Sequence, residues 1–175
     1  MSDIRTWELW RRGVAMAVLP YDPVADAVVL LEQFRLPALA AGVAPVMTEI
    51  PAGFAEPGET AAETARRECA EEIGLVPDRL EPIGEFVLTP GGCDERIGLY
   101  AGRVRAPATD AHGLATGGGG LAAEHEDIRA RVWPAGAAIA AAVAGEIPNS
   151  VAALGLLWLG VRRDWLRDRW RDGGA

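Results

Sequence analysis

The chain has 175 residues, of which half are apolar, and it carries a formal net charge of −8. This length and composition predict one domain with a buried core over 1–175, and the negative charge argues against binding of nucleic acid or of an anionic membrane. Cys69 and Cys93 are too few for a disulfide framework, and residues 1–13 contain no apolar signal-peptide region, so we expect a cytoplasmic protein.

The N-terminal segment, residues 1–12, mixes tryptophan with glutamate and arginine. Trp7 and Trp10 lie three residues apart before any obvious core. They either pack on the domain itself or form a contact between two copies in a dimer, because exposed tryptophans are favoured anchors of interfaces. The sequence leaves both interpretations open.

Two β-rich runs follow, and they predict a hairpin. The apolar run 14–19 is typical of a buried strand, residues 20–23 carry a turn signal, and 27–34 is the second strand. Arg35 ends that strand just before a loop over 37–45. Its guanidinium could clamp a phosphate or form a surface salt bridge.

A short strand over 46–50 then leads into the most informative stretch, 53–75. Glu49 within the strand could support a metal site or cap a neighbouring group. Residues 60–73 lack glycine and proline and are followed by Gly74, which predicts a loop entering a helix that ends there. The helix should press a small apolar stripe onto a sheet. The stripe comprises Ala62, Ala65, Cys69 and Ile73.

Three carboxylates share one face of that helix. Glu68, Glu71 and Glu72 are three and four residues apart, and like charges at this spacing destabilise a helix. A hard divalent cation such as Mg²⁺ or Mn²⁺ would offset them, since it prefers oxygen ligands. The alternative is a solvated acidic face with Arg66 and Arg67 as partners.

Downstream, a strand over 84–88 is broken by a Pro-Gly-Gly sequence before a strand over 97–104. The loop should expose the backbone N–H groups of Gly91 and Gly92 and place Glu95 at a rim, where it could contact ribose or phosphate. An ordinary hairpin with solvated charges is the alternative.

The remaining segments are a long loop, a strand and two helices. Residues 106–123 are rich in glycine and alanine and predict a flexible loop. Such a loop would let Glu124 and Glu126 swing over a metal-bound substrate. A strand over 128–133 and two helices follow, the first starting at Pro134 and the second capped by Asn149. We expect the apolar run 151–161 to be a buried helix, because it is too short to span a bilayer.

The order of residues in 53–75 resembles the Nudix box of the Nudix hydrolase superfamily. The matching residues are Gly53, Glu59, Arg67, Glu68, Glu71, Glu72 and Gly74, whereas Cys69 replaces a larger aliphatic residue. Beyond the box, the chain resembles the ADP-ribose pyrophosphatase branch. Pro90 and four stretches carry this resemblance: RRGVAMAVLPYDPVADAVVLLEQFR, PVMTEIPAGF, TPGGCDERIGLYAGRV and GGLAAEHEDIRARVW. The GDP-mannose pyrophosphatases share much of the same frame.

The resemblance implies an α+β fold, a Nudix-type α/β/α sandwich with a mixed β-sheet, and a homodimer whose active site takes residues from both subunits. It also implies metal ligands, catalytic residues and substrate contacts. Mg²⁺, for which Mn²⁺ could substitute, would be held by Glu68, Glu72, Glu126 and the carbonyl of Ala52, with Glu71 as an additional or indirect ligand. Glu124 would be the general base and would act together with Glu68 and Glu72. Arg35 would hold the diphosphate, Glu95 the terminal ribose, and Gly91 and Gly92 would lie near the substrate. Gly53, Glu59, Arg67 and Gly74 would be structural.

The expected function is Mg²⁺-dependent hydrolysis of the diphosphate bond of a nucleoside diphosphate sugar, with ADP-ribose giving AMP and ribose 5-phosphate. Three alternatives remain open. The substrate could be GDP-mannose or another sugar nucleotide, the chain could be a non-catalytic nucleotide sensor with the same fold, or it could hydrolyse oxidised nucleoside triphosphates.

Overall fold

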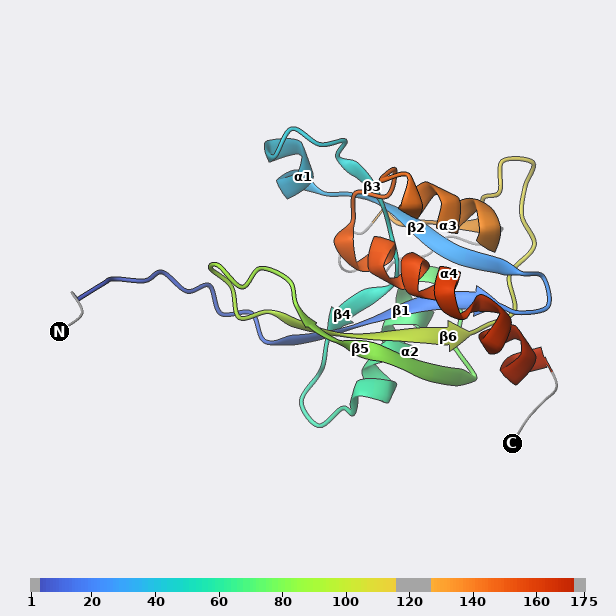
Figure 1. Ribbon diagram of the computed structural model, residues 1–175, viewed down its shortest axis with the longest axis horizontal. Helices are drawn as coiled ribbons and strands as arrows, with labels where there is room; N and C mark the ends of the chain where they lie inside the picture. The colour runs from blue at the N-terminus through green and yellow to red at the C-terminus, as the bar shows by residue number, and fades with distance from the viewer. Residues whose placement is uncertain (1–3, 116–126, 172–175) are drawn as a thin grey trace.

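The computed structural model describes residues 4–115 and 127–171 and confirms the α+β class. Two of the helices interrupt the series of strands and the other two follow it, and Figure 1 shows their arrangement. The strands are β1 (Val14–Asp22), β2 (Ala27–Phe34), β3 (Val46–Glu49), β4 (Ala52–Phe54), β5 (Arg79–Val87), β6 (Arg96–Arg103) and β7 (Arg129–Pro134). The helices are α1 (Leu36–Ala40), α2 (Ala61–Ile73), α3 (Ala135–Val143) and α4 (Ser150–Arg171).

Strand β1 is the centre of a mixed sheet. It runs parallel to β6 along its length, whereas the other strand pairs are antiparallel. Over the described ranges the strand order is β3-β2-β1-β6-β5, with β4 added to β1 and β7 added to β2. Because β4 pairs with the first half of β1, the chain entering α2 is fixed to the middle of the sheet.

The side chains of β1 divide the core into two layers. Leu19 and Tyr21 belong to the cluster that also contains the buried residues of α3 and α4. Met16 and Val18 point the other way and pack with Ala65 of α2. The sheet is therefore covered by α3 and α4 on one face and by α2 on the other, as the alternation of side chains along a strand requires.

Helix α4 is more exposed than we predicted for the run 151–161. Leu156 and Leu159 are fully buried, but Val161 is 84% exposed, so only one face of the helix enters the core. The cap predicted at its start is present. Asn149 Oδ1 accepts the N–H groups of Val151 at 3.1 Å and Ala152 at 2.9 Å. No helix within the described ranges is long and apolar enough to cross a membrane.

Two predicted boundaries were wrong. Strand β1 continues past Leu19 to Asp22, because its parallel ladder with β6 extends through Pro20 and holds that residue in the sheet. The turn lies at 23–26 instead. The expected loop over 37–45 contains α1, in which Pro37 occupies the first turn, a position that tolerates proline because its missing N–H has no partner there.

The segment that follows β6 is hydrogen-bonded as far as it is described. Residues 106–115 lie within the predicted flexible loop 106–123, but they form a turn around Asp110 that pairs with β7. The N–H of Ala115 donates to the carbonyl of Ala130 at 2.9 Å, and that of Val132 to the carbonyl of Gly113 at 2.9 Å. The rest of the predicted loop lies outside the described residues.

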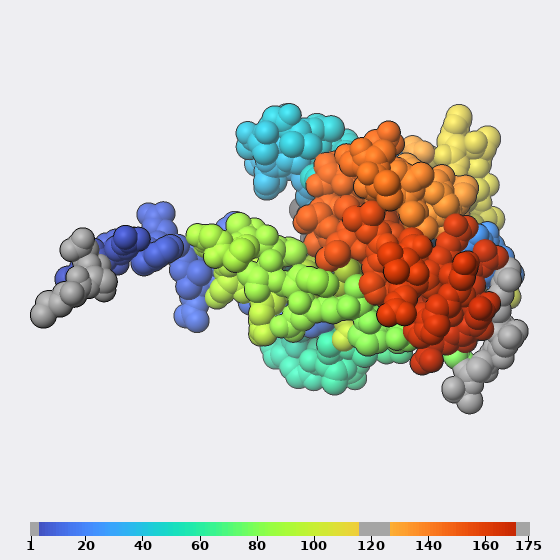
Figure 2. Space-filling model, viewed as in Figure 1, coloured from blue at the N-terminus to red at the C-terminus, as the bar shows by residue number. Residues whose placement is uncertain are grey.

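The N-terminal segment extends away from the sheet (Figures 1 and 2). Ile4 is fully exposed and Trp7 is 77% exposed, so Trp7 does not pack on this chain as one interpretation required. Contact with the domain begins at Trp10, which pairs with Cys93. The segment therefore joins the body of the protein only from residue 10 onward.

Candidate active site

Helix α2 is held in place by signals at both of its ends. Thr60 and Glu63 form a reciprocal capping box, in which the N–H of Thr60 donates to Glu63 Oε2 at 2.8 Å and the N–H of Glu63 donates to Thr60 Oγ1 at 3.3 Å. At the other end Gly74 adopts a left-handed conformation, with φ of 70°. The glycine ends the helix where the sequence predicted.

Arg67 links the loop before α2 to the acidic face of the helix. Its Nε donates to Glu59 Oε1 at 2.8 Å, and one terminal nitrogen donates to the Phe54 carbonyl at 3.0 Å. The other terminal nitrogen contacts Glu68 at 2.7 Å and Glu71 at 2.9 Å. Arg67 and the N–H of Glu56 lower the pKa of Glu59 to about 2, whereas Glu59 raises the pKa of Arg67. These charge-assisted contacts tie the loop before α2 to the helix.

Glu68 and Glu72 both lie against β4. Glu72 is buried, and its Oε2 accepts the N–H of Ala52 at 3.1 Å. The Glu68 carboxylate occupies the space next to Gly53, so a Cβ at that position would overlap it. Burial and the nearby Glu72 carboxylate raise the pKa of the Cys69 thiol to about 12, so the cysteine stays an inert core residue.

The oxygen donors of this face fit a hard divalent cation. Two largely buried carboxylates, Glu68 and Glu72, stand one helical turn apart beside the backbone of Ala52 and Gly53. Glu71 is turned toward Arg67. Within the described ranges, no three His, Cys, Asp or Glu side chains converge closely enough to form a metal site. Glu124 and Glu126, the other acidic residues predicted for the site, lie outside those ranges.

A cleft of about 630 Å³ opens on the other side of β4. Ala52, Gly53 and Phe54 line it, together with α1 and the start of α4. The notch between α1 and the loop before β6 marks it in Figure 2. Neither Glu68 nor Glu72 lines the cleft, although both contact the strand that does. The acidic helix face and the cleft therefore share β4 as a common wall.

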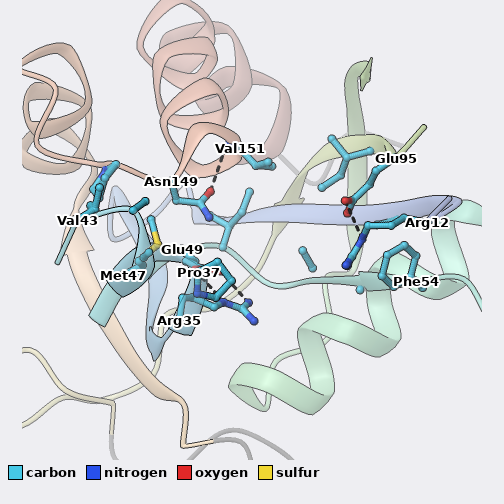
Figure 3. Close-up of a pocket in the computed structure, with 18 residues that line it drawn as sticks. Arg12, Arg35, Pro37, Val43, Met47, Glu49, Phe54, Glu95, Asn149 and Val151 are labelled. Atoms are coloured by element: carbon cyan, nitrogen blue, oxygen red, sulfur yellow. Dashed lines mark hydrogen bonds and ion pairs between the residues drawn. The ribbon is translucent and has the colours of Figure 1, made fainter. Parts of the chain in front are cut away.

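Two arginine–glutamate pairs line the cleft at separate places (Figure 3). Arg35 donates to both oxygens of Glu49, from Nε at 3.1 Å and from a terminal nitrogen at 2.9 Å. Glu49 is buried, so this bidentate contact fixes the Arg35 guanidinium at the end of β2. Glu95, which the sequence placed at a rim, lines the cleft and pairs with Arg12 Nε at 2.9 Å.

The structure separates residues that the sequence grouped together. Gly91 and Gly92 belong to the turn before β6 and do not line the cleft. Glu49 binds Arg35 and is not part of the acidic face of α2. Among the cleft residues, Arg12 and Phe54 had no predicted role. Arg12 belongs to the stretch RRGVAMAVLPYDPVADAVVLLEQFR that carries the family resemblance, but the sequence assigned it no role.

Comparison with known proteins finds relatives over most of the chain. The NUDIX domain model matches residues 11–144. The chain is 39% identical over 163 residues to an ADP-ribose pyrophosphatase of Escherichia coli, covering 93% of this chain and 75% of the relative. It is 29% identical over 159 residues to a GDP-mannose pyrophosphatase of Pectobacterium atrosepticum, covering 90% of this chain and 78% of that protein.

A solved structure has the same fold. The crystal structure of an ADP compounds hydrolase superposes with a TM-score of 0.61, at 22% identity, and the match covers 90% of this chain and 75% of that one. The expected fold and the resemblance of residues 53–75 are thereby confirmed. The chain belongs to the Nudix family of hydrolases, in the branch of its ADP-ribose pyrophosphatase relatives.

Proposed function

We propose that this Nudix hydrolase cleaves the diphosphate bond of ADP-ribose and releases AMP and ribose 5-phosphate. The observation that carries the proposal is the shared wall formed by β4. Ala52 and Gly53 contact the acidic face of α2 on one side and line a cleft with two fixed arginines on the other. Such a wall brings carboxylates suited to a cation next to a cavity suited to an anionic nucleotide.

Nudix hydrolases generally need a divalent metal ion. We propose Mg²⁺, with Mn²⁺ able to replace it, held by Glu68, Glu72 and the carbonyl of Ala52, with Glu71 nearby. When bound, the ion offsets charge on the phosphate oxygens and lowers the pKa of the attacking water. Glu126 completes the ligand set in this proposal, and Glu124 takes the proton from the water.

The cleft residues have separate roles in this proposal. Arg35, already held by Glu49, presents its guanidinium to the diphosphate, because a planar fork of N–H donors matches phosphate oxygens. Glu95 accepts hydrogen bonds from hydroxyl groups of the terminal ribose. Gly91 and Gly92 shape the turn that carries Glu95. Gly53, Glu59, Arg67 and Gly74 hold the loop and the helix. We further propose that the protein works in the cytoplasm as a homodimer.

GDP-mannose is the second candidate substrate. The match to a GDP-mannose pyrophosphatase extends over 90% of the chain, and the cleft contains no described residue that we assign to the nucleotide base. The two candidates share the diphosphate and a terminal sugar, so the same Arg35 and Glu95 contacts would serve both. They differ in the base and in the sugar ring.

A substrate panel tests the proposal. Purified protein is incubated with Mg²⁺ and ADP-ribose, GDP-mannose, ADP-glucose, NADH or diadenosine polyphosphates, and the products are separated by chromatography. We expect ADP-ribose to give the highest kcat/KM. Preference for GDP-mannose would support the second candidate, and failure to hydrolyse any compound of the panel would refute both.

Glu68→Gln then separates an enzyme from a nucleotide sensor. We expect kcat to fall by about 10²-fold or more, because a carboxylate at the reacting centre is lost, whereas a sensor would show only weaker binding. Glu63→Gln is the matched control on the same helix, since glutamine preserves the capping box. Unchanged turnover in Glu68→Gln would remove Glu68 from the mechanism.

A further inference from the structure

Arg12 is held in the cleft by two aromatic rings and one carboxylate. Its guanidinium lies 4.7 Å from the centre of the Trp10 ring and 5.2 Å from that of Phe54. Its Nε pairs with Glu95 Oε2 at 2.9 Å, and Figure 3 shows the two side chains pointing toward each other beside Phe54. Arginine stacks well on aromatic faces, so the cation has a fixed position rather than a range of rotamers.

The backbone around this contact is fixed independently of the Arg12 side chain. The N–H of Trp10 donates to the Gly92 carbonyl at 2.8 Å, and the N–H of Arg96 donates to the carbonyl of Gly13 at 3.0 Å. Between them, the N–H of Arg12 donates to Asp94 Oδ1 at 2.7 Å. Residues 10–13 thus pair with 92–96 as an extension of the β1–β6 ladder. Shortening the side chain at position 12 leaves these hydrogen bonds intact, because backbone N–H groups donate all three.

The pairing with Arg12 reduces the repulsion between the Glu95 carboxylate and an anionic substrate. An isolated carboxylate in the cleft would repel a diphosphate, whereas the adjacent Arg12 offsets its charge. The ion pair engages Oε2 and orients the carboxylate toward the cavity that both residues line. An ionised carboxylate can only accept hydrogen bonds, and sugar hydroxyls can donate them. A fixed, charge-compensated carboxylate is therefore suited to a neutral polyhydroxylated group.

We propose that Arg12 is a positioning residue that holds Glu95 for the terminal sugar and so makes the enzyme discriminate in favour of diphosphates that end in a sugar. The proposal rests on the function proposed above and adds a residue to it. It also gives residues 10–13 a role in substrate choice, because the stacked cation comes from the N-terminal segment.

The test compares two substrates that differ only at the end proposed to contact Glu95. These are ADP-ribose and the ethyl ester of ADP, which keeps the diphosphate but lacks the terminal sugar. Arg12→Ala should raise KM for ADP-ribose about tenfold, the usual effect of losing a charged hydrogen-bonded contact, with kcat changed less than about twofold. KM for the ethyl ester should rise less than KM for ADP-ribose, because the ester lacks the sugar that contacts Glu95 and responds only to the uncompensated charge. Arg12→Lys should recover part of the loss, since it keeps the charge without the fork.

Arg11→Ala is the matched control. Arg11 precedes Arg12, is 85% exposed at its side chain, and lies 3.6 Å from Asp94. It should leave the ratio of the two KM values at the wild-type level. Glu95→Gln keeps the shape of its side chain and the ring contacts of Arg12, and it should raise KM for ADP-ribose relative to KM for the ethyl ester, as Arg12→Ala does. The double variant should be no worse than either single variant, because both remove one interaction.

The outcomes separate this proposal from the function itself. If wild type turns over ADP-ribose but Arg12→Ala and Glu95→Gln keep its discrimination, the positioning role is refuted and the proposed function stands. If wild type shows no turnover, calorimetric binding of both compounds in EDTA replaces KM as the measurement. Loss of ADP-ribose affinity in Arg12→Ala but not in Arg11→Ala then supports the positioning role, and equal affinities refute it. Failure of wild type to bind either compound refutes both proposals.

Discussion

The carboxylate of Glu68 lies against the Cα of Gly53, in the space that a side chain at position 53 would fill. This contact explains why position 53, within β4, is a glycine. The close approach places Glu68 beside the strand that lines the cleft. It also makes position 53 a sensitive test of the site, because the smallest possible side chain would displace the carboxylate.

Gly53→Ala should abolish most activity with little loss of stability. The added methyl group would push Glu68 out of position, and a displacement of about 1 Å at a catalytic centre can cost about 10²-fold in rate. The measurement is kcat/KM for ADP-ribose together with the thermal midpoint. Gly155→Ala is the control, since its new Cβ would make only an ordinary contact at 3.6 Å from Leu19. Wild-type activity in Gly53→Ala would show that Glu68 can move freely.

Arg67→Gln should change how the thermal midpoint depends on pH. Arg67, together with the N–H of Glu56 and the Thr64 hydroxyl, lowers the pKa of Glu59 to about 2 from its usual 4.5, so Glu59 contributes stability that is complete above about pH 4.5 and is lost as the pH falls toward 2. Removing the guanidinium returns the pKa of Glu59 toward its usual value. Wild type should therefore exceed the variant in thermal midpoint at pH 6, and the difference should narrow as the pH falls.

The check is a series of thermal unfolding curves from pH 6 to pH 2 for both proteins. Arg66→Gln serves as the neighbouring control, because Arg66 donates to the carbonyls of Pro77 and Ala62 and to no carboxylate in the described contacts. Its difference from wild type should not change with pH. A gap between wild type and Arg67→Gln that stays constant down to pH 2 would contradict the assignment to Glu59.

Asp26→Asn should destabilise the protein without affecting turnover. Asp26 accepts hydrogen bonds from Tyr21 at 2.8 Å, from Arg163 Nε at 2.9 Å and from Arg167 at 3.0 Å, and so ties the β1–β2 turn to α4. The contact with Arg163 lowers the pKa of Asp26, and burial raises the pKa of Tyr21. None of these residues lines the cleft.

Asparagine keeps the size of the side chain but weakens two ion pairs, for which we expect a loss of about 1–2 kcal/mol in the free energy of unfolding. Urea denaturation measures it, and kcat should match wild type. Arg162→Ala, on an exposed position of α4, should leave the unfolding free energy within about 0.5 kcal/mol. Equal stability of Asp26→Asn and wild type would show that the ion pairs contribute nothing net.

Helix α2 was predictable from the sequence because its boundaries are set by local chemistry. Thr60 and Gly74 mark its ends through a cap and a left-handed conformation, and both signals depend on residues within a few positions. The face shared by Glu68 and Glu72 follows from helical geometry alone. The pattern of these residues was specific enough to indicate the family, which the comparisons confirm.

Other features depend on contacts that a single stretch does not reveal. Strand β4 has three residues after a proline, too few for a periodic pattern, and it exists because β1 pairs with it. Helix α1 was missed because Pro37 reads as a breaker although it occupies the first turn. The pairing of Arg12 with Glu95 joins residues separated by nearly half of the chain in sequence, and the β1–β6 ladder brings them together.

The β1–β6 ladder and the β1–β4 pairing together fix the number of residues between two parts of the cleft. Counting from Trp10, the same continuous run of backbone fixes Arg12 next to Glu95 and, a few residues later, pairs Met16 with Gly53. Inserting or deleting a single residue between positions 10 and 16 would shift one of these partners relative to the other, whereas extra residues ahead of position 10 would disturb neither. We therefore expect related sequences to differ in the number of residues before Trp10 but not in the number between positions 10 and 16.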